Sequence, residues 1–102
     1  MPMGKLALQH LRECLPVFQT LGDSNRQEIL MLLHEHGTLT VNELTDKLRL
    51  SRPAVSHHLK LLLQAGLVAC EQQGTQRHYS ITLGASAALL KKLLAALEED
   101  CL

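Results

Sequence analysis

The feature that most constrains the fold is a change of hydrophobic period after Gly66 of the 102-residue chain. Apolar residues recur at helical spacing in two short segments, the first of which opens with the capping box TVNE (40–43). Only RLS (49–51) separates the segments, which predicts a helix-turn-helix. After Gly66 the period falls to two on both sides of QGTQ (73–76), which predicts a β-hairpin. A hairpin directly after a helix-turn-helix is a wing.

The second of these helices has a clear division of faces. Ser51 is a good N-cap, and Pro53 is tolerated in the first helical turn. We expect the inner face to bury three apolar residues, and Gly66 to end the helix. These apolar residues are Val55, Leu59 and Leu62. The opposite face then presents basic and small polar side chains to solvent.

Two apolar stripes lie at the ends of the chain. Leu8, Leu11, Leu15 and Phe18 are spaced by 3, 4 and 3 residues, as on one face of a helix. From about residue 85 a last helix is predicted, with a stripe that is too wide for one helix at the edge of a small domain. Its members are Leu89, Leu90, Leu93, Leu94, Leu97 and Cys101. We expect a second copy of the chain to cover this stripe.

Composition narrows the class of protein. The chain has 46% hydrophobic residues and 24 leucines, but only one Phe, one Tyr and no Trp, which favours a mostly helical domain with one modest core. It has no apolar run of membrane-spanning length and no signal-peptide pattern, so we expect a soluble, cytoplasmic protein without membrane partners. Three cysteines far apart in sequence are not a disulfide framework.

The charge is unevenly distributed although the formal net charge is zero. Residues 1–46 carry three basic and six acidic side chains, whereas residues 47–78 carry five basic side chains and one acidic. The positive charge therefore surrounds the second helix and the wing. A local basic patch of this kind is what attraction to DNA phosphates requires.

These segments together resemble the ArsR/SmtB family of winged-helix repressors. The resemblance is carried by LGDSNRQEIL (21–30), LSRPAVSHHLKLLLQAGLV (50–68) and GTQRHYSI (74–81). It implies a winged helix-turn-helix of about five helices and a two-stranded wing, dimerising through its first and last helices. It also implies transcriptional repression that is relieved by an inducer.

The expected organisation is one domain over residues 1–102. Residues 1–21 form an N-terminal dimerisation helix, residues 22–83 the DNA-binding core and wing, and residues 85–102 a C-terminal dimerisation helix. The expected partners are a second copy and a pseudo-palindromic operator in double-stranded DNA, with recognition helices roughly 34–36 Å apart.

The candidate DNA-binding residues come from the second helix of the helix-turn-helix and from the wing. By match to the family's motif, DNA contacts fall on Arg52, Pro53, Ser56 and His57. Arg52 has a forked side chain that can bind guanine edges, where the family usually has Gln. The remaining candidates, for phosphate or wing contacts, are Ser51, Lys60, Thr75, Gln76 and Arg77. We expect neighbouring His58 to make an internal hydrogen bond instead.

The residues that could sense an inducer are less clearly marked. The family's thiol-rich metal site would fall on Thr40 and Asn42, which bind soft metals poorly, so no cofactor is expected there. Cys14 and Cys101 could form a thiol switch, because the resemblance packs their helices together. With His10 they could instead hold a thiophilic metal or metalloid. The simplest interpretation is that both cysteines pack as small hydrophobic residues, as we also expect of Cys70.

Two other functional classes are alternatives to the DNA-binding regulator. A winged helix can serve as a protein-interaction module without reading DNA, and its binding would then tolerate salt and the loss of Arg52. An enzyme is poorly supported, because the sequence has no nucleophile–base arrangement, Gly-rich phosphate loop or suitably spaced carboxylate pair.

Overall fold

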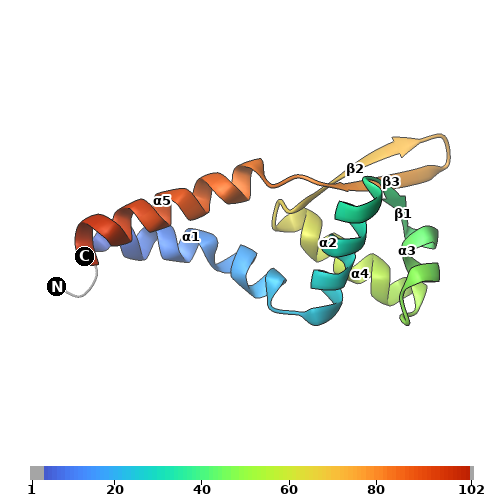
Figure 1. Cartoon of the computed structure of the whole chain (residues 1–102), viewed down its shortest axis with the longest axis horizontal. Helices are drawn as coiled ribbons and strands as arrows, with labels where there is room; N and C mark the ends of the chain where they lie inside the picture. Colours follow the sequence, from blue (N-terminus) through green and yellow to red (C-terminus); the bar gives the residue numbers. More distant parts are fainter. Residues whose placement is uncertain (1–3, 102) are drawn as a thin grey trace.

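A computed structural model describes the backbone of residues 4–101 and the side chains of residues 4–99. Figure 1 shows a body that carries the wing and an arm that extends from it. The arm consists of the first and last helices, and the body contains all the other elements. In chain order these are α1 (Lys5–Leu21), α2 (Ser24–His36), β1 (Leu39–Thr40), α3 (Val41–Lys47), α4 (Arg52–Gln64), β2 (Val68–Gln73), β3 (Gln76–Ile81) and α5 (Gly84–Cys101). The expected winged helix-turn-helix with five helices is confirmed over residues 4–101.

The helices of the body begin at polar caps, and the sequence predicts those at Thr40 and Ser51. Asp23 accepts hydrogen bonds from the N–H groups of Asn25 and Arg26 at the start of α2. The capping box at Thr40 is complete, because Thr40 and Glu43 each bond the other's backbone N–H. The N–H of Thr40, which donates to the Glu43 carboxylate, holds the pKa of Glu43 below its ordinary value. Ser51 caps α4 by accepting from the N–H of Ala54 at 3.3 Å.

The three strands form one antiparallel sheet in the order β1-β3-β2. Strands β2 and β3 are joined by a tight turn in which Gly74 has a φ of 64°, a left-handed value that suits glycine. The sequence did not reveal β1, because two residues show no period. This short strand pairs Leu39 with Tyr79 and thereby fixes the base of the wing to the start of α3.

The core of the body lies where α2, α3 and α4 meet the base of the sheet. The three predicted inward residues of α4 are fully buried there, together with Ile29 and Leu44. Burial of such side chains stabilises the domain by about 1.5–3 kcal/mol each. The outer face of α4 therefore projects from a firmly packed base.

The wing departs from the prediction at Cys70. Alternation with Val68 placed Cys70 in the core, but only Val68 is buried and Cys70 is exposed. The cause is the position of β2 at the edge of the sheet, beyond the helices of the body. No other part of residues 4–101 covers this section of the strand, so alternation there does not produce a buried face.

The arm is formed by α1 and α5 lying side by side (Figure 1). Ala7, Cys14 and Val17 of α1 are buried, as are Leu93 and Ala96 of α5. Helix α1 runs through Pro16 without ending there. The arm makes the molecule elongated, with extents of 52 × 24 × 20 Å.

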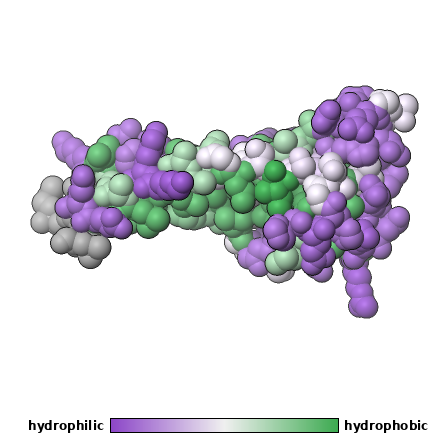
Figure 2. All heavy atoms as spheres, turned by 45° about the horizontal axis from the view of Figure 1, so that its top comes forward, coloured by the Kyte–Doolittle hydropathy of each residue, from purple (hydrophilic) through white to green (hydrophobic). Residues whose placement is uncertain are grey.

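The predicted apolar stripe of α1 faces away from this contact. Leu8, Leu15 and Phe18 are between 38% and 42% exposed, and Leu94 on α5 is 58% exposed. In Figure 2 hydrophobic residues form a band along the arm up to the body, whereas hydrophilic residues cover the end with the wing. Leu8, Leu15 and Phe18 of the α1 stripe and Leu94 of the α5 stripe thus remain uncovered in a single chain, whereas Leu93 of the α5 stripe is buried. No helix within residues 4–101 is long and apolar enough to cross a membrane.

Candidate nucleic-acid interface

A groove of about 790 Å³ runs between α4, the start of α3 and the wing. We call it the α4–wing groove. Its charged residues are Arg52, Lys60 and Arg77, all of them basic. The other residues that line it are Thr40, Val41, Asn42, Ser56, Leu63, Gln64, Thr75, Gln76 and Tyr79. The groove therefore offers positive charge and hydrogen-bonding groups, with an apolar floor.

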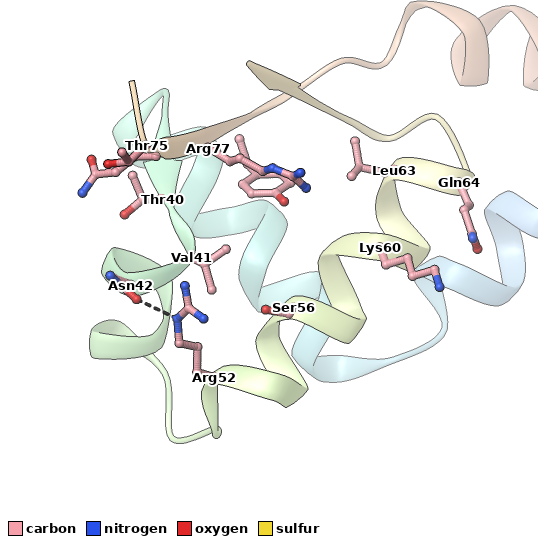
Figure 3. Close-up of a pocket in the computed structure, with 12 residues that line it drawn as sticks. Thr40, Val41, Asn42, Arg52, Ser56, Lys60, Leu63, Gln64, Thr75 and Arg77 are labelled. Atoms are coloured by element: carbon pink, nitrogen blue, oxygen red, sulfur yellow. Dashed lines mark hydrogen bonds between the residues drawn. The ribbon is translucent and has the colours of Figure 1, made fainter. Parts of the chain in front are cut away.

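Helix α4 supplies one side of the groove. Arg52, Ser56 and Lys60 recur at four-residue spacing, so they lie on one side of the helix and point into the groove (Figure 3). All three are exposed. The face of α4 opposite the core thus carries the basic and small polar side chains that the sequence predicts.

The wing supplies the other side of the groove. Thr75 lies at its turn, and Gln76 begins β3. Arg77 follows on β3, across the groove from α4 (Figure 3). These residues are more than ten positions from α4 in sequence. The fold of the hairpin over the body brings them opposite Arg52 and Ser56.

Three predicted site residues lie outside the groove. Pro53 and His57 are exposed but do not line it, because they occupy the side of α4 turned further from the wing. Ser51 is also exposed, and its hydroxyl caps the helix. Six of the nine predicted residues therefore share the groove, and the other three flank it.

Asn42 is a residue of this surface that the sequence-based site did not include. Its side-chain Oδ1 accepts a hydrogen bond of 2.8 Å from Nε of Arg52, drawn as a dashed line in Figure 3. Ten residues separate the pair, so no local pattern reveals the contact. The available signal was the place of Asn42 in the exposed first turn of α3, the first helix of the helix-turn-helix.

His58 makes the internal hydrogen bond that the sequence predicts. Its Nδ1 lies 3.2 Å from Nη1 of Arg26, and a guanidinium only donates, so the ring accepts and carries its proton on Nε2. Burial lowers the pKa of His58, opposed by the charge of Asp23. Arg26 also donates to the carbonyl of Thr20 near the end of α1. Its side chain therefore links α1 to His58 of α4.

The candidate sensor residues lie in the arm. Cys14 is fully buried, and His10 places its Nδ1 3.7 Å from Oε2 of Glu13, beyond hydrogen-bond distance. Among the described residues, no group of three His, Cys, Asp or Glu could hold a metal ion. The side chain of Cys101 lies outside the described part of the chain, so its pairing with Cys14 stays a prediction.

Comparison with known proteins shows which family this chain resembles. Residues 23–69 match the model of "Bacterial regulatory protein, arsR family". The chain is 32% identical to the arsenical resistance operon repressor of Bacillus subtilis over 97% of its own length and 99% of the repressor's. It is 46% identical to an HTH-type transcriptional regulator of Mycobacterium tuberculosis, over 71% of this chain and 66% of that regulator.

A solved structure agrees with the sequence relatives. An ArsR-like transcriptional regulator from a Rhodococcus species superposes with a TM-score of 0.67 and 31% identity, over 87% of this chain and 79% of the other. The match with the Bacillus repressor extends over the arm as well as the body. The chain therefore belongs to the ArsR family, whose members are DNA-binding transcriptional regulators and not enzymes.

Proposed function

We propose that this chain is one protomer of a homodimeric repressor that binds a pseudo-palindromic operator in double-stranded DNA. The observation that carries the proposal is the α4–wing groove, whose charges are all basic and which joins the outer face of α4 to the wing. In this arrangement α4 enters the major groove of DNA, and the wing reaches the adjacent backbone or minor groove. The repressor acts in the cytoplasm, where bacterial operators lie.

Each predicted residue then has a distinct role. Arg52 binds a guanine edge, while Ser56, Lys60 and the start of α4 at Ser51 bind phosphate oxygens. Arg77 binds a phosphate or the minor groove from the wing. Pro53 and His57 lie on the outermost side of α4, where Pro53 packs on a thymine methyl group and His57 hydrogen-bonds a base. Thr75 and Gln76 contact the backbone from the turn.

The arm supports the dimer in this proposal. Leu8, Leu15, Phe18 and Leu94 leave an apolar surface exposed on both of its helices. A second copy that packs on this surface would remove it from water and set the distance between the two α4 helices. Residues 1–21 and 85–102 thus dimerise, and residues 22–83 bind DNA.

Selection from random duplex DNA by the purified protein tests the proposal. We expect one enriched inverted repeat, bound with an affinity that falls steeply as salt rises. A protein-interaction module would enrich no sequence, and this outcome would contradict the proposal. Repeating the selection with an oxidant, a sulfide donor and a panel of metals identifies the class of inducer.

We propose that the inducer acts through the thiols of Cys14 and Cys101. The second alternative is a thiophilic metal or metalloid at His10, Cys14 and Cys101. The full burial of Cys14 supports the simpler alternative, in which that thiol only packs. Mass spectrometry after mild oxidant or sulfide separates these cases. A linked Cys14–Cys101 pair supports a thiol switch, and unmodified thiols support packing.

A further inference from the structure

We infer that Asn42 is a positioning residue for Arg52, which it holds so that the end of the guanidinium faces the base edges of DNA. The inference rests on the proposed function and assigns a specificity-determining role to a residue of α3. It makes sequence reading a property of two helices rather than of α4 alone.

The geometry of the hydrogen bond determines which donors of Arg52 remain for DNA. Nε donates to Oδ1 of Asn42 at 2.8 Å, which uses one of the five N–H donors of the side chain. The four N–H groups on the two terminal nitrogens are not used by this bond. A guanine edge offers two adjacent acceptors, so the terminal pair of nitrogens can bind it as a fork.

Both ends of this hydrogen bond start from fixed backbone. The capping box of Thr40 and Glu43 defines the first turn of α3, where Asn42 lies. Ser51 caps α4 immediately before Arg52. Leu44 of α3 and Val55 of α4 are fully buried in the same core, so the two helix starts keep a constant separation. Asn42 can therefore act as a fixed support for an otherwise mobile side chain.

The expected benefit comes from conformational entropy. An exposed arginine side chain has many rotamers, and restricting them when DNA binds opposes binding. A side chain that Asn42 already holds in place loses less conformational entropy when DNA binds. It also forms hydrogen bonds of poorer geometry with a wrong base than with the correct one. We expect loss of the support to lower discrimination between the correct and a wrong base about three- to tenfold.

A different role for Asn42 makes a different prediction. Asn42 lines the α4–wing groove, so its amide could bind a DNA phosphate directly. Loss of a phosphate contact weakens binding to all sequences alike, whereas loss of positioning weakens the preferred sequence more than the others. The ratio of the affinity for the preferred sequence to the affinity for another sequence therefore distinguishes the two roles.

The experiment measures the affinities of two duplexes, the most enriched one from selection and the same duplex with the guanine opposite Arg52 replaced. The proteins are the wild type, Asn42→Ala, Asn42→Asp, Arg52→Ala and the double variant Asn42→Ala/Arg52→Ala. Asn25→Ala is the matched control, because Asn25 is also the second residue of its helix but lies outside the groove. Thermal unfolding checks that each variant is folded.

We expect Asn42→Ala to lower the affinity ratio, and to have no further effect on it once Arg52 is replaced. Asn42→Asp should retain the ratio, because its carboxylate still accepts from Nε, while the added negative charge weakens binding to both duplexes. The control should match the wild type.

An Asn42→Ala ratio equal to that of the wild type, or an equal loss for both duplexes, overturns the inference while leaving the proposed function in place. The inference is also overturned if Asn42→Ala lowers the ratio further in a protein that already carries Arg52→Ala. If the wild type does not distinguish the two duplexes, Arg52 does not read that guanine and the inference fails. The proposed function fails separately, if the selection enriches no inverted repeat.

Discussion

The arm and the body of this molecule treat apolar side chains in opposite ways. In the body, α2, α3 and α4 bury their apolar faces in one core and expose the polar and basic residues of the α4–wing groove. In the arm, α1 buries small side chains such as Ala7 and Cys14 beside α5 and leaves larger side chains such as Phe18 in solvent.

In the proposed function, this difference assigns DNA binding to the body and dimerisation to the arm. The body encloses its core within one chain, with Val17 of α1 contributing to it. Its polar and basic surface is then left for DNA in the proposed function. The arm is incomplete until another apolar surface covers it. The variants below test whether the two regions differ in this way, from the largest expected effect to the smallest.

Leu94→Glu should have the largest effect, because it places a charge in the surface that we expect a second copy to cover. We expect a folded monomer whose affinity for DNA is weaker on the order of a hundredfold, measured by sedimentation and DNA titration. Met31→Glu is the control, since Met31 is 57% exposed against 58% for Leu94 but lies on α2 in the body. A Leu94→Glu protein that remains dimeric would show that this surface of the arm is not the dimer interface.

Leu59→Ala tests the completeness of the body. Leu59 is fully buried, so its truncation should lower the free energy of unfolding by about 2–5 kcal/mol in urea titrations. Leu63→Ala lies one turn further along the same helix at 37% exposure and should cost less than about 1 kcal/mol. Similar losses for the two variants would show that α4 is not anchored as described.

Arg52→Ala and Lys60→Ala separate base reading from phosphate binding on one helix face. Arg52→Ala should lower affinity for the preferred site by about 1–3 kcal/mol and relax the choice of base there. Lys60→Ala should weaken binding to every sequence alike and reduce the salt slope by about one. Competition titrations at several salt concentrations measure both effects. An unchanged preferred sequence for Arg52→Ala would exclude its base-reading role.

His58 should give the body a small dependence of stability on pH. Burial lowers the pKa of His58 in the folded state, with Asp23, Arg26 and His57 as its charged neighbours. The unfolded chain therefore binds the proton more readily, and stability falls as pH drops below about 6.5 toward the folded pKa. His58→Gln, which can still accept from Arg26, should flatten this fall between about pH 6.5 and 5 in unfolding titrations. Equal slopes for the two proteins would contradict the assignment.

Local signals in the sequence predict much of the body. Thr40 and Ser51 cap helices because their side chains bond N–H groups within three residues, and such contacts can be read from short stretches. The contact between Asn42 and Arg52 is a tertiary contact between two helices, which no local pattern encodes. The strand Leu39–Thr40 is similar, since pairing with β3 defines it.

Periodicity predicts which residues share a face but not what covers that face. The spacing of Leu8, Leu15 and Phe18 correctly identifies a stripe, yet the smaller side chains of Ala7 and Cys14 make the contact with α5. Cys70 shows the same limit in the wing, where the sheet extends past the helices that would bury it.

The central claim is that two grooves are held at a fixed separation by the arm. Affinity for the selected inverted repeat, compared with the same repeat carrying five extra base pairs between its half-sites, tests this most directly. The insertion rotates the half-sites by about half a turn of DNA, so we expect affinity to drop to that of a single half-site. Equal affinity for the two duplexes would contradict a dimer that presents two α4 helices to successive major grooves.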